Sequence, residues 1–180
     1  ESYFVASDPF CAEITLKGFR HLLALNIEEN LPFGLPLLEA ISRIHDQNGL
    51  TVAAHPLVRL WPASLKTKEL FSVIRSHDSR IYFDGFEVLN GSIKNGKARE
   101  FYDEYLSNLC AQVAGSDTHF RTIGKAVTVY DLERGLLKEI KDRRTTVRDC
   151  FRDEDLTPQD YLRNLYRSLI KEPIRRGRII

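Results

Sequence analysis

The stretch Leu50-Thr51-Val52-Ala53-Ala54-His55-Pro56 shows how this chain passes from strand to loop. Its first five residues form a short, apolar, β-capable run, and the run ends at His55-Pro56 because proline cannot donate to a sheet ladder. A helix is expected directly before it, over residues 36–48, since apolar residues recur there at helical spacing and Asn48-Gly49 follows. The stretch therefore predicts a buried strand with a loop at its carboxyl end.

The same order of strand, loop and helix recurs along the chain. Helices are expected over residues 68–75, 98–109 and 133–140, and strands over residues 81–89, 111–114, 126–130 and 145–147. Strands that alternate with helices of about ten residues indicate βα units and a mostly parallel sheet, either open and doubly wound or closed into a barrel. In both arrangements ligands bind at the carboxyl ends of the strands.

The composition is that of an ordinary globular domain. The 180 residues include 26 Lys and Arg against 25 Asp and Glu, which excludes a disordered acidic tail and a uniformly basic nucleic-acid coat. Three cysteines without a Cys-x-x-Cys pair fit a reducing, cytoplasmic setting, with no disulfide framework or zinc ribbon. The longest apolar runs fall far short of the roughly 20 residues of a membrane span. We therefore expect a cytoplasmic protein with no membrane partner.

The C-terminal segment differs in character from the rest. Residues 131–180 carry 13 Lys and Arg against 10 Asp and Glu, and Thr157-Pro158 is a typical helix start. We expect residues 1–150 to form the α/β portion and residues 151–180 to form a basic helical extension. Such an extension could contact RNA, an acidic partner or another subunit, and the oligomeric state stays open.

Metal-capable side chains follow two of the expected strands. His55 comes directly after residues 50–54, and Asp117 and His119 come after residues 111–114. Residues two apart in an extended loop point the same way, so Asp117 and His119 are able to face one ion cluster. Carboxylates bind hard cations and imidazoles bind softer ones, so the pattern indicates a divalent metal site at the carboxyl edge of the sheet.

Several of these stretches resemble motifs of the PHP domain, the polymerase and histidinol phosphatase superfamily. The Ala-His-Pro of residues 52–56, the segment 84–91 and the Gly-Ser-Asp-x-His of residues 114–119 follow the order and spacing of successive family motifs. Upstream, residues 12–15 are similar to the family's glutamate motif, and residues 20–27 to the histidine that opens its next apolar run. The resemblance covers roughly residues 10–147.

This resemblance implies a distorted (β/α)7 TIM-like barrel with two or three divalent ions, usually Zn, Mn or Fe. It implies that Glu13 bridges two ions and that His21 and His55 complete the second site. It further implies that Asp117 belongs to the first site and His119 to a third. Glu13, His55, Asp117 and His119 are accordingly the expected catalytic residues.

The activity that the resemblance implies is hydrolysis of a phosphate ester by metal-bound hydroxide. The substrate would be a small phosphorylated metabolite, a nucleotide or the end of an oligonucleotide, which leaves nucleic acid open as a partner. Cations lower the pKa of bound water, and paired ions stabilise both the attacking and the leaving oxygen. Cations just beyond the metal-binding loops are candidates for holding the phosphate, namely Arg59, Arg121 and Lys125.

One departure from this pattern shapes the expectation. Family members begin with a His-x-His strand, but no His-x-His occurs in this sequence, whose first histidine is His21. We interpret the chain as a barrel without its first strands, with the missing ligands before Glu1, and expect this piece alone to be weak or inactive. The alternative is a non-catalytic PHP-like interaction module that has lost its metal site. His45 and His77 lie away from any strand end, so we expect both at the surface.

Overall fold

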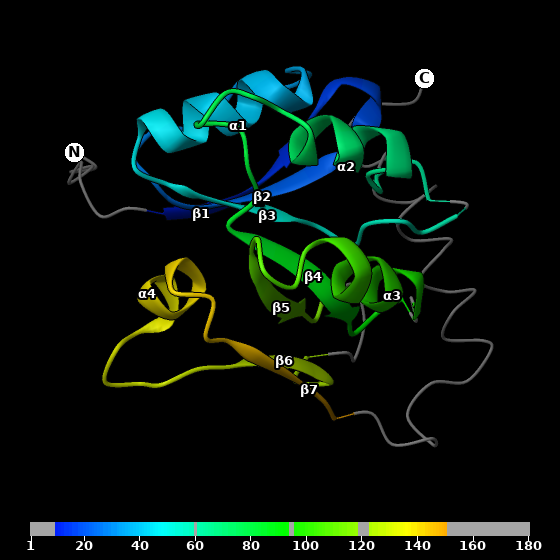
Figure 1. Ribbon diagram of the computed structural model, residues 1–180, viewed down its shortest axis with the longest axis vertical. Coiled ribbons are helices and arrows are strands. Elements are labelled where there is room, and N and C mark those ends of the chain that lie inside the picture. The colour runs from blue at the N-terminus through cyan, green and yellow to red at the C-terminus, as the bar shows by residue number, and fades with distance from the viewer. Residues whose placement is uncertain (1–9, 60, 94–95, 119–122, 151–180) are drawn as a thin grey trace, which may run out of the picture.

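A five-stranded mixed sheet forms the centre of the structure (Figure 1). The structure is a computed structural model and describes residues 10–59, 61–93, 96–118 and 123–150. The sheet has the strand order β1 (Phe10–Thr15), β2 (His21–Ile27), β3 (Leu50–Ala53), β4 (Gly85–Asn90) and β5 (Ala111–Gly115). A second, two-stranded sheet pairs β6 (Ala126–Val129) with β7 (Thr146–Asp149). The helices are α1 (Leu37–Asp46), α2 (Thr67–Ile74), α3 (Gly96–Tyr105) and α4 (Leu136–Lys141).

Helices cover both faces of the central sheet. Buried residues of α1, α2 and α3 join Leu22 and Ala24 of β2 in the larger core. On the other face Ile140 of α4 packs in a smaller core, against which Leu23 and Leu25 of β2 lie. Successive side chains of a strand point to opposite faces, which is why β2 contributes to both cores.

Helix α1 begins and ends close to where the sequence predicts. Pro36 precedes it, and the fixed φ of proline suits the start of a helix. The predicted apolar residues Ile41 and Ile44 are fully buried. The helix stops before Asn48, whose φ is 59°. Gly49 follows because a Cβ there would lie only 2.7 Å from the side chain of Ile27.

The predicted (β/α)7 barrel is wrong, because within the described residues the sheet is open. β1 pairs only with β2, and β6 and β7 form a sheet of their own. Where β5 meets β6, the hydroxyl of Thr128 accepts from the N–H and donates to the carbonyl of Ala114, both at 2.9 Å, in place of a backbone ladder.

A short connection explains why the first strands are not βα units. Residues 16–20 join β1 to β2 through a 3-10 turn at Lys17–Phe19, and the two strands are antiparallel. Parallel neighbours need a crossover of a dozen or more residues, so this connection allows only a hairpin. The strands β3, β4 and β5 are parallel to one another, as the helical connections between them predict.

The direction of β2 brings its first residue to the ligand-binding edge. β2 is antiparallel to both β1 and β3, with Thr15 opposite His21 and Leu22 opposite Ala53. The start of β2 therefore lies beside the carboxyl ends of β1 and β3. His21 precedes its apolar run in the sequence, but it reaches the same edge as the residues that follow the parallel strands.

The described residues also bear on the membrane prediction. None of their helices combines the length and the apolar character needed to cross a membrane. The predicted basic helix within residues 151–180 lies outside the described residues.

Candidate metal centre

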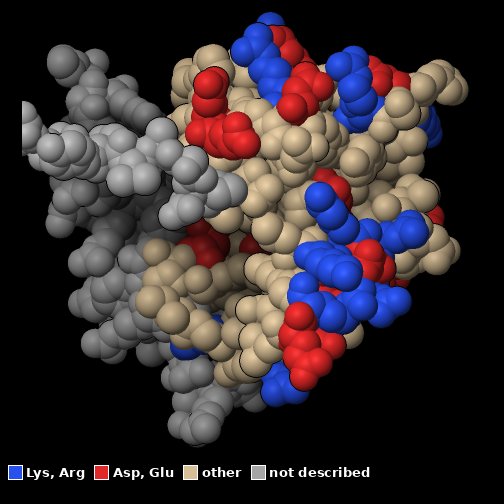
Figure 2. Space-filling model, turned by 90° about the vertical axis from the view of Figure 1, so that its left-hand side faces the viewer, with Lys and Arg blue, Asp and Glu red and all other residues tan. Residues whose placement is uncertain are grey.

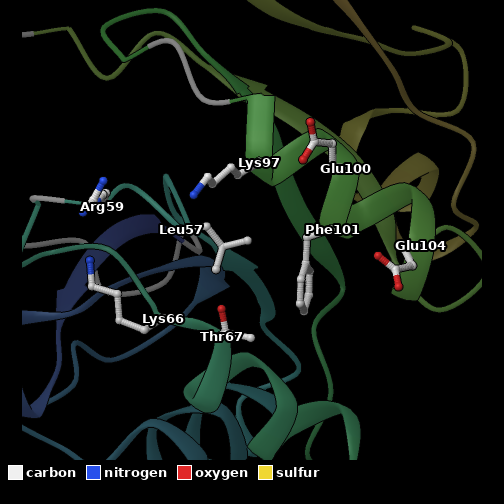
Figure 3. Close-up of a pocket in the computed structure, with 8 residues that line it drawn as sticks. All are labelled: Leu57, Arg59, Lys66, Thr67, Lys97, Glu100, Phe101 and Glu104. Atoms are coloured by element: carbon white, nitrogen blue, oxygen red, sulfur yellow. The ribbon is translucent and has the colours of Figure 1, made fainter.

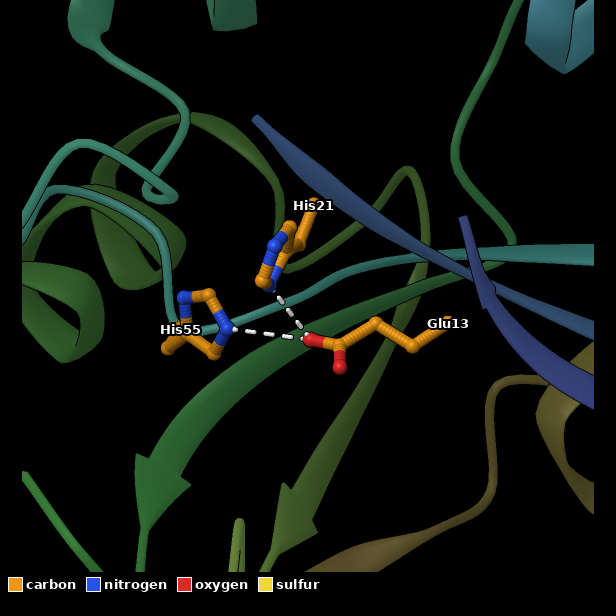
Figure 4. Close-up of side chains that lie close together, drawn as sticks. All are labelled: Glu13, His21 and His55. Carbon is orange, nitrogen blue, oxygen red and sulfur yellow. Dashed lines mark hydrogen bonds and ion pairs between the residues drawn. The ribbon is translucent and has the colours of Figure 1, made fainter. Parts of the chain in front are cut away.

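Glu13, His21 and His55 bring a carboxylate and two imidazoles together at the carboxyl edge of the sheet (Figure 4). One ligand atom of each lies within 4.8 Å of the others. Oε1 of Glu13 is 2.7 Å from Nδ1 of His21 and 3.4 Å from Nε2 of His55. The two imidazole rings meet edge to face, with centroids 5.3 Å apart. This set of one oxygen and two nitrogen donors suits Zn and other divalent transition-metal ions.

Strand register places the first two of these side chains on one face. Glu13 lies opposite Leu23 and Thr15 lies opposite His21, so Glu13 and His21 are diagonal neighbours across β1 and β2. Diagonal neighbours in an antiparallel pair are within reach of long side chains. His55 reaches the same point from the loop that follows β3.

Two imidazole nitrogens in this cluster make no hydrogen bond to any described residue. They are Nδ1 of His21 and Nδ1 of His55, and both are buried. The 2.7 Å contact between His21 and Glu13 is short but lacks the alignment of a hydrogen bond. A buried polar atom without a partner costs about 1–3 kcal/mol. Nδ1 of His21 and Nε2 of His55 both face Oε1 of Glu13, so these residues offer two nitrogens and one oxygen to a single metal ion.

The backbone of His55 is held in an unusual conformation. Its φ is 27°, its N–H donates to the carboxylate of Glu87, and its carbonyl accepts from Oγ of Ser64 at 2.7 Å. A strained backbone of this kind costs about 1–3 kcal/mol and persists only where the surroundings enforce it, most often at functional sites. The His55 side chain is only 4% exposed, so its position is well defined.

The charges of the cluster are strongly coupled. Burial alone would raise the pKa of Glu13, but contacts with His21 and His55 lower it far below its ordinary value. Burial lowers the pKa of His55, but the Glu13 hydrogen bond and the charges of Asp117 and Glu87 outweigh burial and raise this pKa above its ordinary value. Burial raises the pKa of Glu87 to about 7, against the hydrogen bond from His55. Three carboxyl groups thus surround one imidazole, and the charge of those that are ionised favours a cation there.

Asn90 joins two of these carboxylates. Its Nδ2 lies 3.3 Å from Oε1 of Glu87 and 3.3 Å from Oδ2 of Asp117. Glu87 and Asn90 are both buried, and Asp117 has a left-handed φ of 43°. Asp117 therefore lies next to the cluster of Glu13, His21 and His55, although it is not one of the three that meet within 4.8 Å.

Sequence reasoning assigned no role to Glu87 or Asn90. For Glu87 a signal was available, because a carboxylate interrupts the otherwise apolar stretch 85–89, and a buried strand carries a charge only when that charge is paired. Asn90 follows the strand-end rule that pointed to His55 and Asp117, since it is the last residue of β4. Neither signal names the partner of the side chain.

A pocket of about 400 Å³ is lined by residues that follow β3 and β4 (Figure 3). Figure 3 shows the nitrogen ends of Arg59, Lys66 and Lys97 on one side and the carboxylates of Glu100 and Glu104 on the other. Nζ of Lys66 already donates to two backbone carbonyls, at 2.7 and 2.9 Å. Arg59 and Lys97 are exposed and are the pocket's best placed cations for an anionic ligand.

The remaining predicted site residues are distributed as follows. His119 and Arg121 lie outside the described residues. Arg59 lines the pocket, whereas Lys125 is half-buried at the start of β6, where its carbonyl accepts from the N–H of Cys150, and it does not line the pocket. The structure therefore places Arg59, but not Lys125, in a cavity near the sheet edge.

The prediction of a surface position holds for His77 but is wrong for His45. His77 is exposed. The side chain of His45 is only 8% exposed, with Nε2 2.9 Å from Oδ2 of Asp84 and Nδ1 2.6 Å from the carbonyl of Arg80. Its ring also stacks on Tyr82, with centroids 4.2 Å apart. These partners come from the segment before β4, which helix periodicity alone cannot place.

The fold and the site define an open, mixed α/β protein with a candidate Glu-His-His metal centre. No family model matches the chain, and no curated protein matches it. The crystal structure of PsfC from Pseudomonas syringae PB-5123 is similar, with a TM-score of 0.54 and 18% identity over 91% of this chain. The chain spans 65% of the length of that PsfC chain. At this identity the likeness supports the fold alone, and membership of the PHP superfamily stays a prediction.

Proposed function

We propose that this chain binds a divalent metal ion through Glu13, His21 and His55 and forms part of a metal-dependent phosphoesterase. The observation that carries the proposal is that side chains from β1, β2 and the loop after β3 bring one carboxylate oxygen and two imidazole nitrogens within 4.8 Å of one another. The PHP-like motifs support the same residues. A bound ion would act as a Lewis acid toward phosphate oxygens and lower the pKa of water.

The chain's own residues have different roles around that ion. Glu13, His21 and His55 would hold Zn, Mn or Fe, each of which accepts carboxylate and imidazole ligands. Asp117 would supply a further carboxylate to a second ion, consistent with its position beside Asn90. Glu87 accepts the His55 N–H and so keeps the ligand-bearing loop against β4.

The pocket beside the sheet edge supports a phosphorylated small molecule or nucleotide as substrate. Arg59 and Lys97 present positive charge there, and charge-assisted hydrogen bonds to phosphate are strong. The face in Figure 2 intersperses Lys and Arg with Asp and Glu. The pocket also combines its cations with the carboxylates of Glu100 and Glu104, so it suits a small phosphate ester better than a long nucleic acid, which favours a continuous positive surface.

The cysteines support a cytoplasmic setting for this activity. Cys11 and Cys150 are exposed thiols and Cys110 is a buried one, and none of the three forms a disulfide in the described residues. Exposed thiols persist in reducing compartments.

Metal binding and phosphate release test the proposal together. Protein freed of metal with a chelator is dialysed against Zn²⁺ or Mn²⁺, its metal content is measured, and phosphate release from nucleoside monophosphates and p-nitrophenyl phosphate is followed. We expect at least one bound ion, and we expect His55→Ala to lose both the ion and any phosphate release. His77→Ala is the matched control, because His77 is an exposed histidine outside the cluster. A chain that binds no ion would contradict the proposal and favour the non-catalytic interaction module.

A further inference from the structure

We propose that Asn90 is a positioning residue of the metal centre, which holds the Asp117 carboxylate directly and the His55 loop through Glu87. The inference rests on the proposed function, because Asn90 acts through residues that would ligate the ion. Asn90 is the last residue of β4 and is 3% exposed. A fully buried amide at the ligand-binding edge needs partners for all of its polar atoms.

The four hydrogen bonds of Asn90 determine how its amide is oriented. Oδ1 accepts from the N–H groups of Ser92 and Ile93, at 2.8 and 2.9 Å. The two hydrogens of Nδ2 are thereby directed toward the carboxylates of Glu87 and Asp117, each 3.3 Å away. An asparagine amide offers two donors and one oxygen with two lone pairs, so its capacity is fully used.

This arrangement connects residues of three parallel strands. The Asn90 amide places a neutral double donor between two carboxylates that would otherwise repel each other. The second oxygen of Glu87 accepts the N–H of His55, which follows β3, while Asp117 follows β5. Asn90 on β4 therefore sets the relative position of side chains from the strands on either side of it.

The variant Asn90→Asp replaces the amide donor with a charged acceptor. It keeps the shape of the side chain and the oxygen that accepts from Ser92 and Ile93, but it places a third acceptor against Glu87 and Asp117. Partners of metal ligands are worth about 10-fold to 100-fold in metal affinity. We expect the affinity for Zn²⁺, measured by competition with a fluorescent chelator on the full chain, to fall at least about tenfold. We also expect the visible d–d bands of bound Co²⁺ to change, a signature that general destabilisation does not produce.

Two further variants make the outcome decisive. Asn30→Asp adds the same charge at an exposed residue and should leave the Zn²⁺ affinity unchanged. The double variant combines Asn90→Asp with Glu87→Gln. The new amide at position 87 donates to the carboxylate at position 90, while Asp117 still faces that carboxylate. This double variant serves if Asn90→Asp does not fold, and it should show the same loss of affinity.

Each result separates the inference from the proposed function. An unmodified chain that binds neither Zn²⁺ nor Co²⁺ overturns the proposed function and this inference with it. An unmodified chain that binds Zn²⁺, together with Asn90→Asp or the double variant binding equally well or more tightly, overturns the role of Asn90 alone.

Discussion

Gly115 lies directly against the carboxylate of Glu87, since a Cβ on Gly115 would come within 2.5 Å of Oε1 of Glu87. The Glu87 side chain is buried and accepts hydrogen bonds from His55 and Asn90, so it cannot move aside without losing them. The glycine at the end of β5 therefore provides the space in which the polar network around the candidate metal centre assembles.

The first prediction follows from this contact. Gly115→Ala should lower the free energy of unfolding by about 1–3 kcal/mol, the usual cost of overfilling a packed site. Urea denaturation measures it, and the Zn²⁺ affinity should fall with it because Glu87 is displaced from His55. Gly96→Ala is the matched control, since a Cβ there would meet nothing within 4 Å. Equal stability of the two variants would refute the steric argument.

The second prediction concerns His45, far from the proposed ligands. Both of its ring nitrogens face acceptors, the carboxylate of Asp84 and the carbonyl of Arg80, so only the protonated ring donates to both. Burial lowers the pKa of His45, but these two hydrogen bonds and the charges of Asp84 and Asp46 raise it above its ordinary value. The stabilisation is therefore fully present below the unfolded pKa of about 6.5 and is lost as the pH rises through the higher folded pKa.

Denaturation of His45→Gln at several pH values isolates this contribution. Glutamine donates to one of the two acceptors and does not titrate. We expect the difference in unfolding free energy between the unmodified chain and His45→Gln to be largest near pH 6 and to shrink above the folded pKa of His45. At the low end of the pH range we expect a difference of about 1.5–3 kcal/mol, which is typical of hydrogen bonds to charged groups. A difference that does not vary with pH would contradict the protonated state of His45.

The third prediction is that metal binding stabilises the chain. A ligand that binds only the folded state adds about 2.7 kcal/mol at 100 times its Kd, so Zn²⁺ should raise the melting temperature and EDTA should reverse the rise. Glu13→Gln should remove most of this shift, because it takes away the charged oxygen nearest both imidazoles. Glu28→Gln, at an exposed residue outside the cluster, should keep it. Scanning calorimetry with and without metal gives the answer.

The fourth prediction concerns the pocket of Figure 3. Arg59→Ala and Lys97→Ala should each weaken binding of inorganic phosphate about tenfold, which corresponds to loss of one charge-assisted hydrogen bond. Isothermal titration calorimetry measures the Kd. Arg43→Ala is the control, since the exposed Arg43 pairs with Glu39 on the same helix. Phosphate affinity that responds equally to all three substitutions would indicate general charge attraction and not a site in the pocket.

The secondary structure could largely be predicted, because its signals are local. The helix before Asn48, the strand that ends before His55 and the parallel run from β3 to β5 all follow from periodicity and from the positions of glycine and proline. Barrel closure could not be predicted in the same way. It depends on how β1 pairs and on whether β5 and β6 share a backbone ladder, and neither is a property of a single segment.

The site residues likewise include some that local sequence patterns identify and others that only strand pairing identifies. His55 and Asp117 could be identified from sequence because both follow a strand, and the strand-end rule needs no partner. Glu13 and His21 required a resemblance, since β1 and β2 are antiparallel and their register is set by pairing. Glu87 and Asn90 received no assignment, because their roles consist of contacts with His55 and Asp117 on other strands.

The sequence by itself determined the helices, the strands from β3 to β7 and which metal-capable side chains follow a strand, because these depend on patterns a few residues long. Only the tertiary structure decided that the sheet is open, that Glu13 and His21 meet His55, and that Asn90 lies between two carboxylates. Those relationships depend on the direction and register of neighbouring strands, and residues distant in the sequence set both when the chain packs.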